Sequence, residues 1–127
     1  MKKAMSGLAI ALATSLIAGS AMADGDVKKG EKVFKRCKAC HKVEDGKNGV
    51  GPHLFGIVGR AVAGVEDYKY SKAMDAYGAN GEVWDAERLD RYLTKPKKEV
   101  KGTKMAFAGL KKEKQRVDLQ AYLETLK

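Results

Sequence analysis

Apolar residues near the C-terminal end of the chain recur at the spacing of an α-helix. The four positions are Leu119, Tyr122, Leu123 and Leu126, which fall three or four residues apart or side by side. This spacing places all four on one helical face. We therefore expect a helix over about 112–126, with that face turned toward a core.

Three more helical stretches are predicted, two of them marked by a capping residue. Asp26 can cap a first helix that runs through about Ala39. The apolar and small residues of this helix recur at helical intervals: Gly30, Val33, Phe34 and Cys37. A second, short helix-like stretch covers residues 71–77 and contains Met74.

Residues 85–95 form a third predicted helix. Asp85 is the N-cap, and Trp84 and Leu89 occupy the two positions of a hydrophobic staple. Pro96 ends this helix, because a proline cannot continue it. Glycines and an asparagine crowd residues 45–51 and predict a loop, and no alternating strand pattern competes. The expected fold is all-α and single-domain.

Residues 1–23 have the features of a cleavable export signal. Lys2 and Lys3 form a basic end, residues 8–18 are apolar, and residues 21–23 are a small-residue cleavage site. Cleavage would leave a 104-residue domain, 24–127, in the periplasm. No apolar run of about 18 residues follows Ala23, so we expect no membrane span in the mature chain. We expect it to be a monomer.

The net charge points to anionic partners. The chain has 25 basic and 16 acidic residues, a formal charge of +9, and loss of Lys2 and Lys3 reduces it to +7. An acidic protein face, nucleic acid or a membrane surface could each attract it. Nucleic acid is disfavoured by the export signal and by the absence of a nucleic-acid-binding motif.

Two cysteines, Cys37 and Cys40, precede His41 directly. A disulfide would close a very short ring and stabilise little, and a thioredoxin-like pair would need a βαβ context. A zinc site would need a fourth, distant ligand, His53. The pattern C-x-x-C-H is instead typical of haem attachment. Two thiols on one helical turn can add to two porphyrin vinyl groups, and the next residue directs an imidazole at the iron.

A second axial ligand has three candidates. Met74 lies in a helix-like stretch, where a core role explains a methionine better. Met105 lies between Gly102 and Gly109, outside any helical stripe, and is therefore the preferred ligand. His53 follows a proline shortly after the attachment motif, and we interpret it as a loop histidine.

The sequence resembles the class I c-type cytochromes, most of all bacterial cytochrome c2 and mitochondrial cytochrome c, from about Gly30 to the C-terminus. The resemblance rests on Cys37 to His41, Gly51 to Leu54, Gly59-Arg60, Tyr68 to Tyr70, Trp84, Tyr92-Leu93, Pro96 to Lys98, and Gly102 to Gly109. It implies short helices and loops wrapped around one covalently bound haem c. A haem would also supply the large apolar partner that a small domain needs.

The resemblance also implies a role for each site residue. Cys37 and Cys40 would form the thioethers, and His41 and Met105 would be the axial ligands. Pro52 would accept a hydrogen bond from His41. The haem propionates would accept hydrogen bonds from Arg60, Tyr70 and Trp84. The side of the haem that faces Met105 would be ordered by Tyr92, Thr103 and Phe107. Two positions depart from the family pattern. Met74 stands where an asparagine is usual, and Lys101 replaces a proline before the methionine loop.

The implied function is soluble one-electron transfer, not catalysis. The partners would be acidic faces of redox proteins such as a quinol-oxidising cytochrome complex, a photosynthetic reaction centre or a terminal oxidase. A haem enzyme or gas sensor with an open coordination site is the alternative. The family pattern gathers several cations near the exposed haem edge, namely Arg36, Lys38, Lys97, Lys98, Lys104, Lys111 and Lys112.

Overall fold

The computed structural model describes residues 24–127, so the expected export signal, 1–23, lies outside the described residues. Five helices follow in order: α1 (Val27–Phe34), α2 (Lys72–Tyr77), α3 (Ala86–Thr94), α4 (Pro96–Glu99) and α5 (Glu113–Glu124). Within the described chain the only β pairing is an isolated bridge between Ala61 and Val83. The all-α expectation is confirmed. No helix in the described part is long and apolar enough to cross a membrane.

The capping predictions are confirmed. The Asp26 carboxylate accepts a hydrogen bond from the Lys29 amide at 2.9 Å, and Asp85 accepts one from the Arg88 amide at 2.8 Å. Helix α3 ends before Pro96, as expected, but the same proline begins α4. Its fixed φ and missing amide proton suit a first helical position as well as they end the preceding helix.

The first helix is shorter than predicted, because α1 ends at Phe34 and not near Ala39. Tighter turns follow, in which the Cys37 amide donates to the Phe34 carbonyl at 2.7 Å. The attachment motif therefore lies just beyond the helix. A local helical turn survives there, since the His41 amide donates to the Cys37 carbonyl at 2.9 Å.

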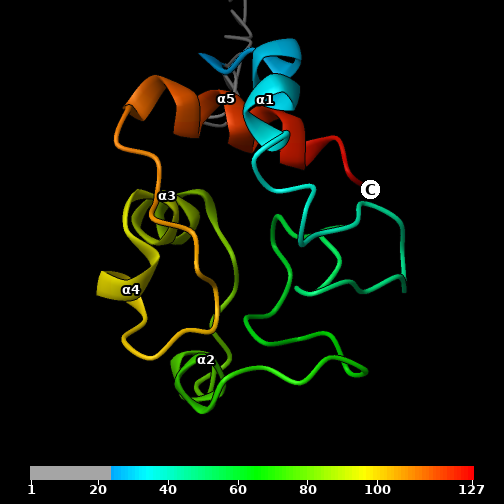
Figure 1. Ribbon diagram of the computed structural model, residues 1–127, viewed down its shortest axis with the longest axis vertical. Helices are drawn as coiled ribbons and strands as arrows, with labels where there is room; N and C mark the ends of the chain where they lie inside the picture. Colours follow the sequence, from blue (N-terminus) through cyan, green and yellow to red (C-terminus); the bar gives the residue numbers. More distant parts are fainter. Residues whose placement is uncertain (1–23) are drawn as a thin grey trace, which may run out of the picture.

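Helices α1 and α5 cross at one end of the molecule, with α3 and α4 below them and α2 at the opposite end (Figure 1). The segment between α1 and α2 is mostly loop and forms the other side. The core includes Phe34 from α1, Met74 from α2, Leu89 from α3 and Leu119 from α5, each at most 7% exposed. The expected core placement of Met74 is confirmed.

Gly30 allows the close crossing of α1 and α5. A Cβ atom added at Gly30 would lie 1.9 Å from the carbonyl oxygen of Asp118, an atom of the α5 backbone. The Asp118 side chain also accepts a hydrogen bond from the Asp26 amide at 2.8 Å. The crossing therefore has both a backbone contact and a hydrogen bond between the two ends of the domain.

Replacing Gly30 with alanine should destabilise the fold by roughly 3 kcal/mol, because two packed backbones must separate. Denaturant unfolding of the haem-loaded protein measures this loss. Gly46→Ala is the control, since Gly46 has a φ of 71° but nothing lies near its added Cβ. That change should cost only the backbone strain of about 1 kcal/mol. Equal losses for both variants would contradict the packing argument.

Candidate functional site

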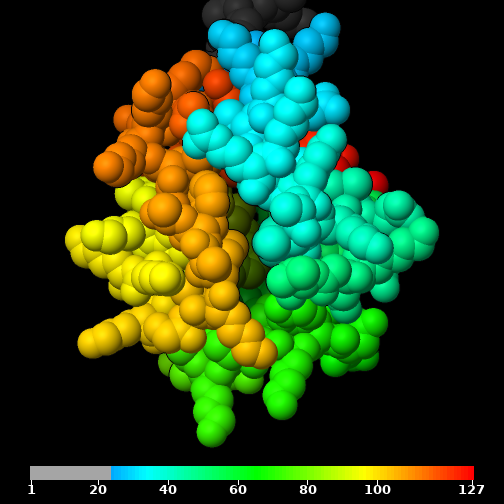
Figure 2. Space-filling view, viewed as in Figure 1, coloured from blue at the N-terminus to red at the C-terminus, as the bar shows by residue number. Residues whose placement is uncertain are grey.

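A cavity of about 460 Å³ opens between the helical side and the loop side of the molecule. Figure 2 shows the hollow between the segment that follows α1 and the segment that precedes α5. All of the predicted site residues line it: Cys37, Cys40, His41, Pro52, Arg60, Tyr70, Trp84, Tyr92, Thr103, Met105 and Phe107. Apolar side chains make up much of the remaining wall, among them Phe34, Leu54, Ile57, Leu89, Leu93 and Leu119.

His41 is held in one orientation by its neighbours. Its Nδ1 donates a hydrogen bond to the Pro52 carbonyl at 2.7 Å, as the family resemblance implies. Gly51 leaves room for the ring, because a Cβ there would lie 2.5 Å from His41 Cε1. With Nδ1 protonated and bonded, Nε2 keeps its lone pair for a metal.

Burial lowers the pKa of His41, and the nearby Arg60 charge lowers it further, although the hydrogen bond to Pro52 acts in the opposite direction. A lowered pKa keeps the imidazole neutral at pH 7. Neutral imidazole is the form that binds metals. The geometry and the charge state therefore both suit a ligand.

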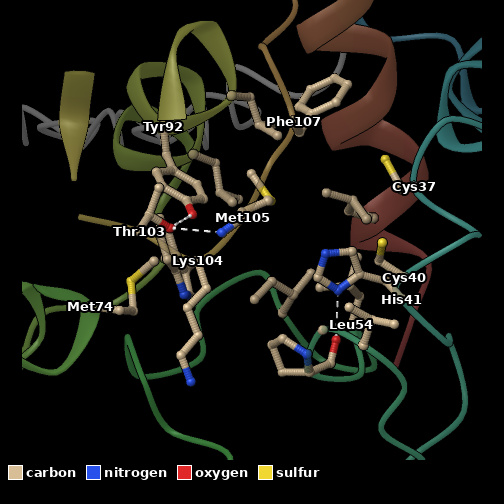
Figure 3. A pocket seen from close by; sticks show the side chains of 18 of the residues that line it. Cys37, Cys40, His41, Leu54, Met74, Tyr92, Thr103, Lys104, Met105 and Phe107 are labelled. Carbon is tan, nitrogen blue, oxygen red and sulfur yellow. Dashed lines mark hydrogen bonds between the residues drawn. The ribbon is translucent and has the colours of Figure 1, made fainter. Parts of the chain in front are cut away.

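The two cysteines lie on the same side of the cavity as His41 (Figure 3). Both are free thiols, with Cys37 partly buried and Cys40 exposed. Burial raises the pKa of Cys37 to about 11, partly offset by the Arg36 charge and reinforced by Cys40. Cys37 is therefore a neutral thiol at pH 7, and its position near Cys40 suits two bonds to one group inside the cavity.

Met105 lies across the cavity from His41 (Figure 3). A small hydrogen-bonded unit fixes the adjacent backbone. The Tyr92 and Thr103 hydroxyls are 2.8 Å apart, and the Met105 amide donates to the Thr103 hydroxyl at 3.4 Å. Tyr92 belongs to α3, so this helix helps to position the loop that carries the methionine.

A third part of the wall contains Arg60 and Tyr70. Arg60 Nη1 donates to the carbonyls of His53 and Phe55, at 2.9 and 3.1 Å, while its buried Nε has no hydrogen-bond partner in the described chain. The Tyr70 hydroxyl accepts a bond from the Val65 amide and keeps its own proton to donate. An unpaired guanidinium donor beside a phenol fits a carboxylate such as a haem propionate.

The structure adds details that the sequence pattern did not give. Met74 is buried, as expected, but it also lines the cavity. Tyr68 also lines the cavity and donates to the Val50 carbonyl at 2.9 Å. His53 is buried within its loop and is not among the cavity-lining residues described. The spacing of these three residues in the sequence does not show which side chains line the cavity and which are buried elsewhere.

Comparison with known proteins identifies the family. A sequence model of the cytochrome c family matches residues 27–127. The chain is 57% identical over 103 residues to a protein named cytochrome c-type cyt cy from Rhodobacter capsulatus, covering 80% of this chain and half the length of that protein. It is 50% identical over 101 residues to cytochrome c2 from Agrobacterium tumefaciens, covering 79% and 91% of the two chains.

A solved structure, cytochrome cH from Methylobacterium extorquens, superposes with a TM-score of 0.73 at 46% identity and covers 80% of this chain and 99% of its own. The chain belongs to the cytochrome c family and has the class I fold. It is an electron-transfer protein with one covalently bound haem c. The apolar cavity, the paired thiols and the unpaired Arg60 donor fit that group.

Proposed function

We propose that this chain is a soluble periplasmic one-electron carrier in which His41 and Met105 are the axial ligands of the haem. The placement of these two side chains on opposite sides of one cavity carries the proposal (Figure 3). Cys37 and Cys40 would hold the haem through two thioethers. The bound haem supplies a one-electron couple at its iron, and the chain supplies attachment, ligands and surroundings.

Each wall of the cavity would contribute to the stability of the reduced state. The Met105 thioether is a soft ligand that favours ferrous iron. The apolar lining penalises the extra positive charge of the ferric state. Pro52 would hold the His41 ring, and Arg60, Tyr70 and Trp84 would accommodate the propionates. With both axial positions filled, small molecules would have no open site, and a positive reduction potential is expected.

The optical spectrum of the purified protein tests this proposal against a haem enzyme or gas sensor. The ferric form should show the weak far-red band that marks methionine ligation in this family, and the ferrous form should not change its spectrum under carbon monoxide. A ferrous form that binds carbon monoxide readily would support the open-site alternative. A redox titration should fit a single one-electron step.

The charged rim of the cavity supports docking to an acidic redox partner. Arg36 and Lys104 line the cavity and are exposed. Lys97 and Lys98 are exposed on α4, and it is the family pattern that puts them near the same rim. Such a patch raises encounter rates with anionic partners, and salt screens it beyond about 8 Å at physiological ionic strength. A quinol-oxidising complex, a photosynthetic reaction centre or a terminal oxidase would provide such a partner. The export signal expected over 1–23 supports the periplasmic location.

Reversing a charge at the rim should slow electron transfer to an anionic oxidant. Ferricyanide is a suitable probe, and its rate with the wild-type protein should fall about tenfold from low to physiological salt. Lys104→Glu or Lys97→Glu should lower the low-salt rate more than Lys28→Glu or Lys127→Glu, which change the net charge equally. A cationic cobalt complex should show the reverse order. Equal effects at all four positions would show that net charge alone governs the encounter.

A further inference from the structure

The segment that carries Met105 is fixed mainly at its two ends. At one end the Thr103 amide donates to the Val100 carbonyl at 3.0 Å, and at the other the Leu110 amide donates to the Leu93 carbonyl at 2.8 Å. Between these bonds, residues 104–109 make no hydrogen bond from backbone to backbone within the described chain. The Met105 amide bonds only to the Thr103 hydroxyl, at the N-terminal end, and the Lys104 ammonium donates to the Lys69 carbonyl at 2.9 Å. The position of Met105 therefore depends on how firmly each end is held.

The C-terminal end of this segment is pressed against α3. Leu110 is 1% exposed, and a Cβ added at Gly109 would lie 2.2 Å from the Thr94 carbonyl oxygen. Gly109 also has a φ of 109°, which side chains rarely adopt. The same helix carries Tyr92, which bonds to Thr103 at the other end. Helix α3 is thus the common support of both ends.

Arg116 on α5 clamps the C-terminal end to this support. Its Nη1 donates to the carbonyls of Leu110 and Lys111, at 2.8 and 3.0 Å. Its Nε donates to the Asp90 carboxylate on α3 at 2.7 Å, and only 11% of the Arg116 side chain is exposed. One buried guanidinium therefore joins α5, α3 and the end of the methionine segment.

Buried charge-assisted hydrogen bonds are directional and costly to leave unmade. The planar guanidinium suits this site because one donor reaches the acid while another reaches two carbonyls. A lysine could keep the charge and the contact with Asp90. Its single ammonium group could not also reach the two carbonyls, as the separate nitrogens of the guanidinium do. The arrangement therefore depends on arginine itself.

We infer that Arg116 is a positioning residue that keeps the Met105 thioether at the iron. It is not among the cavity-lining residues described, so it acts through Leu110 and Lys111. Opening of the segment must break the bonds to these carbonyls or carry Arg116 with it. This inference rests on the proposed function, in which Met105 is an axial ligand.

Arg116→Lys in the haem-loaded protein tests the inference. Cyanide can bind the ferric iron only when the thioether leaves, so its apparent affinity reports the open population. Loss of the two carbonyl bonds should strengthen cyanide binding about tenfold, since each bond contributes several-fold to the closed state. Amide exchange at Leu110 should accelerate by a similar factor, which reports the chain independently of the haem.

Arg91→Lys is the matched control. Arg91 also pairs with an acid, at 3.0 Å from Glu99, but it has no hydrogen bond to the methionine segment in the described chain. The Arg91→Lys variant should therefore bind cyanide with the same affinity as the wild type. Asp90→Asn is the second test variant, because it weakens the support of Arg116 and keeps both carbonyl bonds. Its effect on cyanide binding should lie between the wild type and Arg116→Lys.

The outcomes separate this inference from the proposed function. If the wild type shows the far-red band but Arg116→Lys leaves both cyanide affinity and Leu110 exchange unchanged, the inference is wrong and the ligation stands. A lower unfolding midpoint with unchanged cyanide affinity would also reject it, because Arg116 would then act on stability alone. If the wild type lacks the far-red band, Met105 ligation fails, and the positioning role fails with it.

Discussion

A chain with serine in place of both Cys37 and Cys40 should carry no covalent haem and should lose most of its helical structure. The physical reason is the size of the central cavity, about 460 Å³. Unfilled cavity volume costs about 24 cal/mol per Å³, so an empty site would cost roughly 11 kcal/mol. That cost is comparable to the whole stability of a domain of this size.

Extraction into acidified organic solvent measures the first effect, because non-covalent haem leaves the protein and thioether-bound haem does not. Circular dichroism measures the second. The single variant Cys37→Ser is the control, since Cys40 could still form one thioether and retain the pigment. A compact, colourless and helical double variant would contradict the view that the haem forms the core.

Replacing Met105 with alanine should open the iron to cyanide and lower the reduction potential by about 0.1 V or more. Axial ligands set haem potentials over a range of about 0.8 V, and loss of a thioether removes a ligand that favours ferrous iron. The far-red band should disappear. Spectral titration with cyanide and a redox titration measure the two effects.

Met74→Ala is the control for this variant, because Met74 is the other methionine that lines the cavity. It should keep the far-red band while losing about 2–5 kcal/mol of stability, the usual cost of truncating a buried methionine. The two changes should therefore separate ligation from packing. Loss of the band in Met74→Ala and its retention in Met105→Ala would reverse the assignment.

Local signals in the sequence predicted most of the helices. Asp26 and Asp85 cap helices where expected, because a side-chain cap is a contact between near neighbours. The end of α1 could not be predicted in this way. Residues beyond Phe34 continue the helical spacing, but the chain turns there to direct Cys37 and His41 toward the cavity. Tertiary packing overrides a local pattern in this segment.

The attachment motif predicted Cys37, Cys40 and His41, and the placement of Met105 in a loop predicted the second ligand. The family pattern predicted the other site residues, but no signal predicted a role for Arg116. In the sequence Arg116 is one of many cations in a basic chain, and nothing in its spacing shows that it is buried. Its partners are two backbone carbonyls and an acid on another helix. Backbone partners leave no mark on residue identity, so such a site can be recognised only in three dimensions.

The crossing of α1 and α5 joins the two ends of the domain, since the bond from Asp26 to Asp118 spans 92 residues. A polypeptide is made from its N-terminal end, so Cys37, Cys40 and His41 exist before α5 does. Until α5 has been synthesised, α1 lacks the surface against which Gly30 packs. A chain that is not yet complete therefore cannot form this crossing, and α5 does not enclose its attachment motif.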